Sequence, residues 1–440
     1  MLDINKLKNN FAEAELLIKD NREVRYDFEN WDLEEITSKD LSELSLRVRD
    51  NNKSGSSTAT GSSSKVLDNL IAGAKKSVEF GEPAYFNFSD EKLNAADQNT
   101  ESKFSEVKSN QLVEFAREIK NTFKEKKPDL TLNFSINKNY EKIKLLTTRG
   151  AELKENKTGF SFFFSVPIPG GGSELYRYYE SDNLFEEIPE ADIDEFIEEY
   201  ELTEQISKPK TGKMPVLFSP RALYFFLVSL ETGVSSQNIF QGTSPLIDKL
   251  GDPIFSDKLT VIDKPQIKGT SFGRMFDDEG ITTSEKSIIE NGKLNSYLYD
   301  LEYASKMDTI STGNGMKNTL FGSGIDTPVN PSFVHPVISP GNKSKAGLLA
   351  EVNEGILVEN VIGFHSSNYT QGHFSVQAQG FHVKGGKLQG RLEDVMLAGN
   401  IYSDFKNIIG IGDRTILSPM VSSIGNFPYI LVDQLSVTGE

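Results

Sequence analysis

The sequence predicts an α+β protein: an N-terminal α/β half, built on an antiparallel sheet with helices, followed by a larger strand-rich C-terminal half. At 440 residues the chain exceeds the roughly 250 to 300 residues at which single hydrophobic cores stop growing, so more than one domain is expected. Helical patterns cluster before residue 232, and later segments such as YILVDQLSV are typical of strands. We therefore predict domains at residues 1–210 and 214–440.

The first element expected is a short helix from Asn5 to Ala14. EVRYDFEN, WDLEEITS and ELSLRVRD then alternate large and polar residues, which predicts antiparallel strands. The run from Ser54 to Lys65 resembles a flexible linker, but its last serines are placed to cap the helix KVLDNLIAGAKKSVEF. A hairpin tip before a capped helix is therefore preferred to a linker.

The segment QLVEFAREIKNTFKEK predicts an amphipathic helix whose buried face carries Leu112, Phe115, Ile119 and Phe123. Strands follow and end in GFSFFFSVP, where aromatic residues at both odd and even positions indicate that the strand is buried on both sides. An acidic helix is expected from about Ala191.

The basic stretch at residues 207–213 then marks the predicted domain boundary. After it, the apolar segment from Ala222 to Leu230 is far shorter than the roughly 20 residues of a membrane helix and predicts a buried helix.

Charge and cysteine content limit the possible partners and compartment. The formal net charge of -17 disfavours nucleic acid and anionic membranes as partners. The absence of cysteine removes disulfides, thiolate ligands and cysteine nucleophiles, and fits a reducing compartment. The N-terminus lacks the apolar core of a secretion signal, so we expect a cytoplasmic protein.

All four histidines (His335, His365, His373 and His382) lie within 48 residues, which raises the possibility of a metal site. Zinc sites usually present ligands at short fixed intervals on a helix or knuckle, whereas these residues lie on predicted strands and turns. Structural histidines are therefore the preferred interpretation.

The motif FDDEGITT places Asp277, Asp278 and Glu279 beside a turn, with Asp263 upstream. Carboxylate oxygens could hold Ca²⁺ or Mg²⁺, but the spacing does not match an EF-hand loop. A contiguous acidic turn more often accepts backbone N–H groups or faces water. Neither a nucleophile-elbow motif nor a phosphate-binding loop is present.

The C-terminal half contains a series of distinctive phrases: VLFSPRA, QGTSPLIDKLGDPIFSDKLTVIDKP, FDDEGITT, STGNG, EGILVENVIGFHSSNYTQGHFSVQAQGFHV and MLAGNIYSDFKNIIGIG. In this order they resemble the TldD/PmbA family of metalloprotease-like proteins. Family members of the PmbA type usually read G-D-F-S where this chain has Gly372, His373, Phe374 and Ser375. The N-terminal half agrees more loosely.

The resemblance implies a division between zinc-bearing TldD-type subunits, with an H-E-x-x-x-H helix and a cysteine, and TldE-type subunits that lack them and pair with the first. Laid on that pattern, the ligand and base positions fall near Val228, Ser229 and Gly233, and no cysteine exists. No catalytic, cofactor or metal residue is therefore expected in this chain, and zinc is expected in the partner.

The resemblance thus implies a non-catalytic partner in a protease that cleaves unfolded polypeptides or leader peptides. The expected partner is a TldD-like homologue, or a second copy of the chain, and the substrate is an extended peptide. One alternative is an independent hydrolase with an unfamiliar metal site among His365, His373 and His382 or the carboxylates of Asp277, Asp278 and Glu279. Another is a homodimeric peptide-binding protein.

Overall fold

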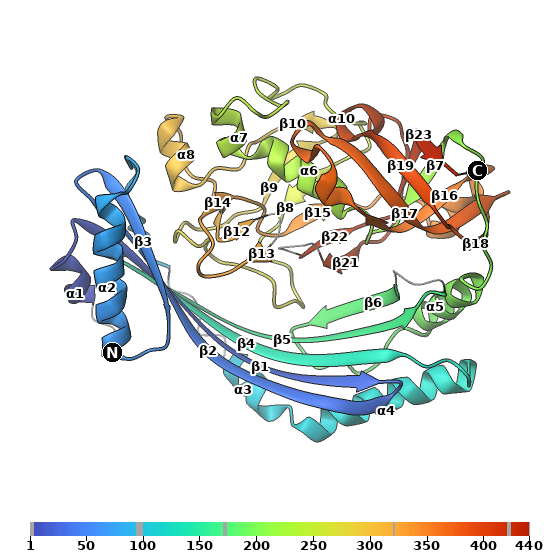
Figure 1. Cartoon of the computed structure of the whole chain (residues 1–440), viewed down its shortest axis with the longest axis horizontal. Coiled ribbons are helices and arrows are strands. Elements are labelled where there is room, and N and C mark those ends of the chain that lie inside the picture. Colours follow the sequence, from blue (N-terminus) through green and yellow to red (C-terminus); the bar gives the residue numbers. More distant parts are fainter. Residues whose placement is uncertain (1–3, 94–99, 170–173, 320–321, 420–423, 440) are drawn as a thin grey trace.

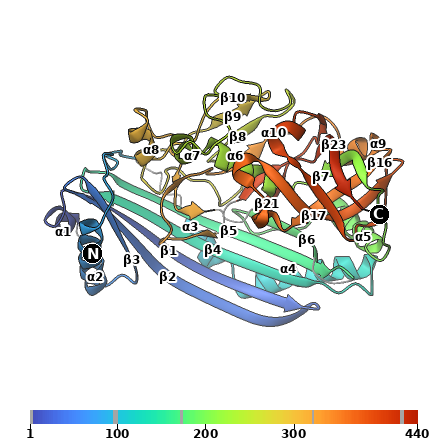
Figure 2. The same cartoon turned by 45° about the horizontal axis from the view of Figure 1, so that its top comes forward.

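The computed structural model describes residues 4–93, 100–169, 174–319, 322–419 and 424–439. Within these ranges the chain has the predicted α+β fold. A long curved sheet with helices forms the N-terminal half, and smaller sheets around one buried helix form the C-terminal half (Figures 1 and 2).

The N-terminal sheet is antiparallel throughout, with strand order β3-β2-β1-β4-β5-β6. Its strands are β1 (Glu13–Glu29), β2 (Asp32–Asp50), β3 (Lys53–Thr60), β4 (Asn133–Thr147), β5 (Glu152–Pro167) and β6 (Glu174–Ser181). The helices of this half are α1 (Ile4–Lys8), α2 (Ser64–Glu79), α3 (Thr100–Glu106), α4 (Ser109–Lys126) and α5 (Glu190–Leu202).

The alternation of side chains along β1 assigns the two faces of this sheet. Leu16 packs with α2 and Tyr26 packs with α4, whereas Leu17 packs with Phe276 of the C-terminal half. Helices therefore cover the outer face and the C-terminal half covers part of the inner face (Figure 1). The predicted buried face of α4 is confirmed, since Leu112, Phe115, Ile119 and Phe123 are all buried.

Two local predictions were wrong. The first helix ends at Lys8, because residues from Glu13 onward pair with β2, and those from Glu15 onward also pair with β4, so sheet pairing overrides the local helical preference. The serine-rich run is neither a hairpin tip nor a linker: residues Lys53–Thr60 form β3, and Ser63 caps α2 by accepting from Val66 N.

The aromatic segment of β5 is buried mainly on one side. Phe160, Phe162 and Phe164 are buried on the side of the helices, while Phe163, on the other side, is only half-buried and contacts Tyr176. The prediction of burial on both sides was therefore only partly right, because Phe163 keeps part of its surface exposed.

Five strands of the C-terminal half form a closed ring, because their pairings run β16-β7-β23-β19-β17 and return to β16. They are β7 (Gly212–Phe218), β16 (Glu354–Ile362), β17 (His373–Lys384), β19 (Val395–Asn400) and β23 (Ile430–Thr438), with β18 (Lys387–Arg391) and β20 (Ile408–Ile411) attached.

A second sheet has the order β10-β9-β8-β15-β22-β21. Its strands are β8 (Val261–Asp263), β9 (Lys286–Glu290), β10 (Lys293–Leu294), β15 (Pro336–Ile338), β21 (Ile416–Pro419) and β22 (Ile424–Phe427). Two short pairs join β11 (Gly315–Met316) to β14 (Asn330–Pro331) and β12 (Asn318–Thr319) to β13 (Gly322–Ser323).

The helices of this half are short apart from α6 (Tyr224–Val234), which lies in the core. The others are α7 (Ser236–Phe240), α8 (Leu301–Lys306), α9 (Lys345–Ala350), α10 (Ile401–Asp404) and the 3₁₀ turns η1 (Phe364–Ser366) and η2 (Tyr369–Gln371). Among the helices described, none has the length and apolar character needed to cross a bilayer.

Candidate functional site

Helix α6 occupies the centre of the C-terminal core. Its residues pack against strands of both the closed ring and the second sheet, for example Val216 and Val261. Phe225, Phe226 and Leu230 are fully buried, as predicted for the apolar segment. A helix that is apolar all round must be enclosed in this way.

The positions that the resemblance equates with two zinc ligands (Val228 and Gly233) and the glutamate base (Ser229) lie together on this helix. Val228 and Ser229 are buried, and the Tyr402 hydroxyl donates to the Ser229 carbonyl oxygen at 3.2 Å. At Gly233 an added Cβ would overlap the same hydroxyl. Tyr402, whose ring stacks on Phe255 at 5.7 Å between centroids, therefore occupies the space beside these positions.

The side chains at these three positions do not provide the donor atoms of a zinc site. A zinc site draws on imidazole, thiolate or carboxylate donors. Val228 and Gly233 offer no side-chain donor, and the Ser229 hydroxyl, which has no hydrogen-bond partner, is a single weak one. These three residues therefore support no zinc-dependent step.

Asp277 organises the acidic turn through backbone hydrogen bonds. Its Oδ1 accepts from Glu279 N at 3.0 Å and Ile281 N at 2.9 Å, and its Oδ2 accepts from Gly315 N at 2.8 Å. Burial and the neighbouring Glu279 raise the pKa of Asp277 well above its ordinary value. The carboxyl group is thus engaged in shaping the turn.

Asp278 is neutralised by two cations. It lies 3.1 Å from Lys19 Nζ and 3.0 Å from Arg274 Nη2, and it also accepts from Lys317 N at 2.8 Å. Burial alone would raise the pKa of Asp278, but Lys19 and Arg274 hold it below its ordinary value. Lys19 lies on β1, so this pair joins the two halves of the chain.

Glu279 makes a second bridge between the halves. Its Oε1 accepts from Arg47 Nη1 at 2.8 Å, and its Oε2 accepts from Leu301 N at 2.7 Å. Arg47 also forms a two-bond pair with Glu15 at 2.7 and 3.0 Å. Sequence reasoning missed these partners, because nothing local connects β1 and β2 to a turn more than two hundred residues away.

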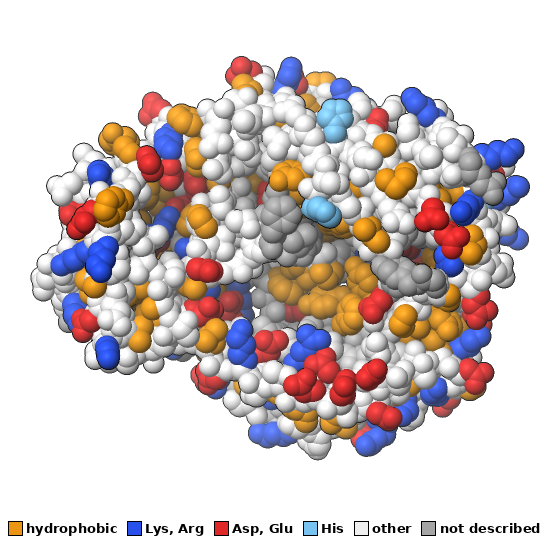
Figure 3. Space-filling model, in the orientation of Figure 1, with side chains coloured by type: hydrophobic (Ala, Val, Ile, Leu, Met, Phe, Trp, Pro, Cys, Tyr) orange, Lys and Arg blue, Asp and Glu red, His pale blue; other side chains and the backbone are white. Residues whose placement is uncertain are grey.

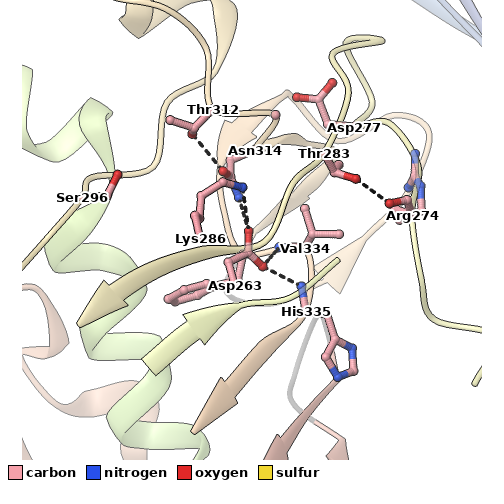
Figure 4. Close-up of polar contacts among 12 residues, drawn as sticks. Asp263, Arg274, Asp277, Thr283, Lys286, Ser296, Thr312, Asn314, Val334 and His335 are labelled. Atoms are coloured by element: carbon pink, nitrogen blue, oxygen red, sulfur yellow. Dashed lines mark hydrogen bonds and ion pairs between the residues drawn. The ribbon is translucent and has the colours of Figure 1, made fainter. Parts of the chain in front are cut away.

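Asp263, the upstream carboxylate, anchors a separate buried network (Figure 4). Its Oδ1 accepts from Val334 N at 3.1 Å and His335 N at 2.9 Å, and its Oδ2 accepts from Asn314 Nδ2 at 2.7 Å. The His335 ring bonds Asn426 Oδ1 through Nε2 at 2.8 Å. These side chains hold strands and loops in register.

Two histidines on β17 lie far from each other. His373 begins the strand and His382 lies nine residues further on, which at about 3.3 Å per residue separates them by roughly 30 Å. His373 is exposed and lines an open cavity of about 550 Å³. His365, in η1, is also exposed. Across the described ranges, no group of three or more His, Asp or Glu residues is arranged to hold a metal ion.

His382 joins a serine and a carboxylate that sequence reasoning did not connect. Its Nδ1 lies 2.8 Å from Ser207 Oγ, and its Nε2 lies 2.9 Å from Glu354 Oε1. The order serine, histidine, acid resembles a hydrolase relay. A hydrolase site needs a cavity for its substrate, but the cavities of about 240, 550 and 1,110 Å³ are lined by other residues. We therefore interpret the triplet as a structural contact that holds the segment after α5 against β17.

A hollow lies between the two halves, with hydrophobic side chains in its interior (Figure 3). At one part of the junction, a cavity of about 240 Å³ is bordered by residues 176–180 of β6 and 414–417 around β21. Elsewhere, the cavity of about 1,110 Å³ adjoins β4, β5 and residues 266–271. Both are places where a ligand could contact the two halves at once.

Comparison with known proteins identifies the class first. The sequence profile described as the PmbA/TldA metallopeptidase C-terminal domain matches residues 211–439, just over half of the chain. The protein is therefore metallopeptidase-like in its C-terminal half. The chain belongs to the PmbA/TldD family.

Individual relatives agree with this assignment. An uncharacterized protein of Methanocaldococcus jannaschii is 29% identical over 306 residues, covering 66% of this chain and 68% of that protein. A metalloprotease PmbA homolog of Buchnera aphidicola is 28% identical over 231 residues, covering 52% of this chain and 47% of that protein. The match therefore spans about half the length of this PmbA homolog.

Solved structures share the fold over nearly the whole chain. TldE from Thermococcus kodakarensis superposes with a TM-score of 0.87 at 20% identity, covering 99% of both chains. A putative modulator of a DNA gyrase from Thermotoga maritima gives a TM-score of 0.80 at 22% identity, covering 99% of this chain and 98% of that one. At these identities the likeness concerns the fold.

Proposed function

We propose that this chain is a non-catalytic subunit of TldE type, which pairs with a zinc-bearing TldD-like relative in the cytoplasm. The pair cleaves unfolded polypeptides or leader peptides. The observation that supports the proposal is the composition of α6, which has Val228, Ser229 and Gly233 where the family resemblance implies two zinc ligands and a glutamate base.

Hydrolysis by a zinc-bound water needs three protein ligands, one open position and a nearby carboxylate base. The described surroundings of α6 supply a tyrosine at that place instead, and Tyr402 cannot serve as a base while its hydroxyl donates to Ser229. In this proposal the chain has the fold of the family, and its partner carries out the zinc-dependent hydrolysis.

The hollow between the halves supports a role in holding substrate. An extended polypeptide offers backbone donors and acceptors to strand edges, and side chains to apolar walls. The described walls combine both kinds of surface. In this proposal the subunit helps to enclose and orient the chain that its partner cleaves.

Co-expression with the H-E-x-x-x-H homologue from the same genome tests the pairing. We expect the two chains to co-purify and to degrade an unfolded substrate such as denatured casein, with activity abolished by a chelator. The matched control replaces the motif glutamate of the homologue with glutamine, which should preserve pairing and stop cleavage.

Chelator-sensitive cleavage by this chain alone would overturn the proposal. Failure of the two chains to associate at micromolar concentrations would overturn the pairing, and a stable dimer of this chain alone would then favour the homodimeric peptide-binding alternative.

A further inference from the structure

The first half of β2 forms a free border of the N-terminal sheet. Its neighbour β3 pairs only with residues 43–50, and Gly61 N then donates to Ser42 O at 2.8 Å as the chain turns away toward α2. Residues 32–41 therefore have β1 on one side and no described strand on the other (Figures 1 and 2). An edge strand of this kind presents alternate backbone N–H and C=O groups without sheet partners.

The side chains along this border are uncovered as well. Every residue from Asp32 to Asp40 is exposed, including Leu33 at 44% and Ile36 at 53%. Apolar side chains on an exposed strand edge are unusual in a chain that meets no partner, because such an edge is a template for pairing with another polypeptide.

The edge of β3 shows how the same sheet closes a border when no partner is needed. Ser54 N donates to Glu82 O at 2.9 Å, and Ser56 N donates to Ser77 Oγ at 3.0 Å, so α2 and the segment after it satisfy this edge. Along residues 32–41, by contrast, the described hydrogen bonds of the backbone all go to β1. That stretch of β2 is available to a strand from another chain.

The charge of the border indicates which kind of strand it accepts. Residues 32–41 carry one ammonium group, on Lys39, and four carboxylates, a net charge of -3; the carboxylates belong to Asp32, Glu34, Glu35 and Asp40. Like charges on facing strands are destabilising, so two copies of this border repel each other and a cationic strand is favoured.

The register limits the length of regular pairing. The pairing of β2 with β1 shifts between Asp27 and Phe28 of β1, and it is regular from Glu35 onward. The border suited to a further strand is therefore the seven-residue stretch from Glu35 to Leu41. Within it, Ile36 lies opposite Tyr26 of β1, on the face of the sheet that the helices cover elsewhere.

We propose that the border from Glu35 to Leu41 pairs with an extended cationic segment of another polypeptide, which continues the sheet beyond β2. The backbone of the segment bonds to the free N–H and C=O groups, its basic side chains lie opposite Glu35 and Asp40, and an apolar side chain contacts Ile36. The inference goes beyond the proposed function, because this border belongs to the N-terminal sheet and not to α6 or to the hollow between the halves.

Fluorescence anisotropy with the full chain alone tests the surface. The probe is a labelled heptapeptide, Val-Lys-Thr-Thr-Val-Ile-Lys, whose lysines lie opposite Asp40 and Glu35 when it runs antiparallel to β2. Two further peptides carry backbone N-methyl groups, one on the second, fourth and sixth residues and the other on the third, fifth and seventh. Only alternate amides of a paired strand face its neighbour, so one of these two peptides, and not the other, should bind at least tenfold more weakly than the probe.

Charge reversal tests the preference for a cation. Glu34 and Glu35 are exposed and have no ion pair within the described part of the chain. Glu34→Lys/Glu35→Lys should weaken binding of the probe at least fivefold at low ionic strength, and salt should reduce this difference. The matched control is Glu186→Lys/Glu187→Lys, which changes two adjacent exposed glutamates before α5 by the same net charge and should leave binding unchanged.

Equal losses for the two N-methyl peptides, no loss for either, or no binding of the probe up to 1 mM would each overturn the inference. Equal effects of the two double variants would also overturn it, because binding would then depend on net charge and not on the border of β2. Since the chain is measured alone, peptide binding can succeed while pairing with a zinc-bearing homologue fails, and the reverse, which separates the two proposals.

Discussion

The hydroxyl of Tyr402 donates a hydrogen bond of 3.2 Å to the backbone carbonyl of Ser229, one turn from Gly233. A Cβ added at Gly233 would lie only 2.1 Å from the same hydroxyl oxygen and would overlap it. The tyrosine and the glycine are therefore a matched pair, and each constrains what the other position can be.

Gly233→Ala should lower the free energy of unfolding by about 1 to 3 kcal/mol, because overpacking outweighs the better helix propensity of alanine. In a Tyr402→Phe background the hydroxyl is gone, and we expect the cost of Gly233→Ala to fall by at least about 1 kcal/mol. Urea unfolding of the four proteins of this cycle measures the coupling.

Gly347→Ala in α9 is the control, since its Cβ would meet only ordinary contacts, and it should be neutral or stabilising by up to about 1 kcal/mol. Additive effects of Gly233→Ala and Tyr402→Phe would contradict the proposed matched pair.

Arg47→Met should destabilise the chain by about 3 to 5 kcal/mol, because it leaves the buried Glu15 and Glu279 without their cation. Arg25→Met removes an ion pair with Asp27 that is largely exposed, and it should cost less than about 1 kcal/mol. Chemical denaturation of both variants makes the comparison, and similar losses would show that Arg47 does not carry the junction.

Glu231 should make the chain less stable as pH rises. Burial raises its pKa from 4.5 to about 7 in the folded chain, against the hydrogen bond that it accepts from Phe333 N. A raised carboxyl pKa favours the protonated form in the folded state, so the stabilisation is complete below about pH 4.5 and is lost as the pH passes through about 7.

Glu231→Gln should therefore gain stability relative to the natural sequence between pH 5 and pH 8, measured by urea unfolding at several pH values. The same change at exposed Glu204 is the control. A constant difference between Glu231→Gln and the natural sequence over this range would refute the expectation.

Chelation should leave the unfolding midpoint of the isolated chain unchanged, and so should millimolar Ca²⁺ or Mg²⁺. The oxygens of Asp277 are already bonded to three backbone N–H groups, and Asp278 is already paired with Lys19 and Arg274. Thermal unfolding with and without chelator is the measurement. A midpoint that falls on chelation would favour the independent metal-dependent hydrolase.

Sequence patterns correctly predicted those helices and caps that are determined by residues close together in the chain. The stripe of Leu112, Phe115, Ile119 and Phe123 and the cap at Ser63 depend on neighbours within a few residues, and both were recognisable. The need for glycine at position 55 in β3 was not recognisable from the sequence. It arises because Val78 on α2 approaches so closely that any Cβ at this position would collide with it. Such contacts exist only after the fold has formed.

At the candidate site, the family resemblance located Val228, Ser229 and Gly233 but could not indicate what stands beside them. Tyr402 reaches α6 from a segment more than 160 residues later, as its bond to Ser229 shows. The partners of Asp278 and Glu279 were equally hidden, since Lys19 and Arg47 lie on strands whose alternating pattern gives no sign of a distant carboxylate.

The contact between Arg47 and Glu279 spans 232 residues of chain, and this distance has a consequence for biosynthesis. During translation, β1 and β2 emerge long before the acidic turn, so Glu15 is the only one of the two carboxylate partners of Arg47 that is present until most of the protein has been made. Contacts of such high sequence separation slow folding. The inner face of the nascent N-terminal sheet therefore stays uncovered, and its final closure depends on the later synthesis of two consecutive acidic residues, Asp278 and Glu279.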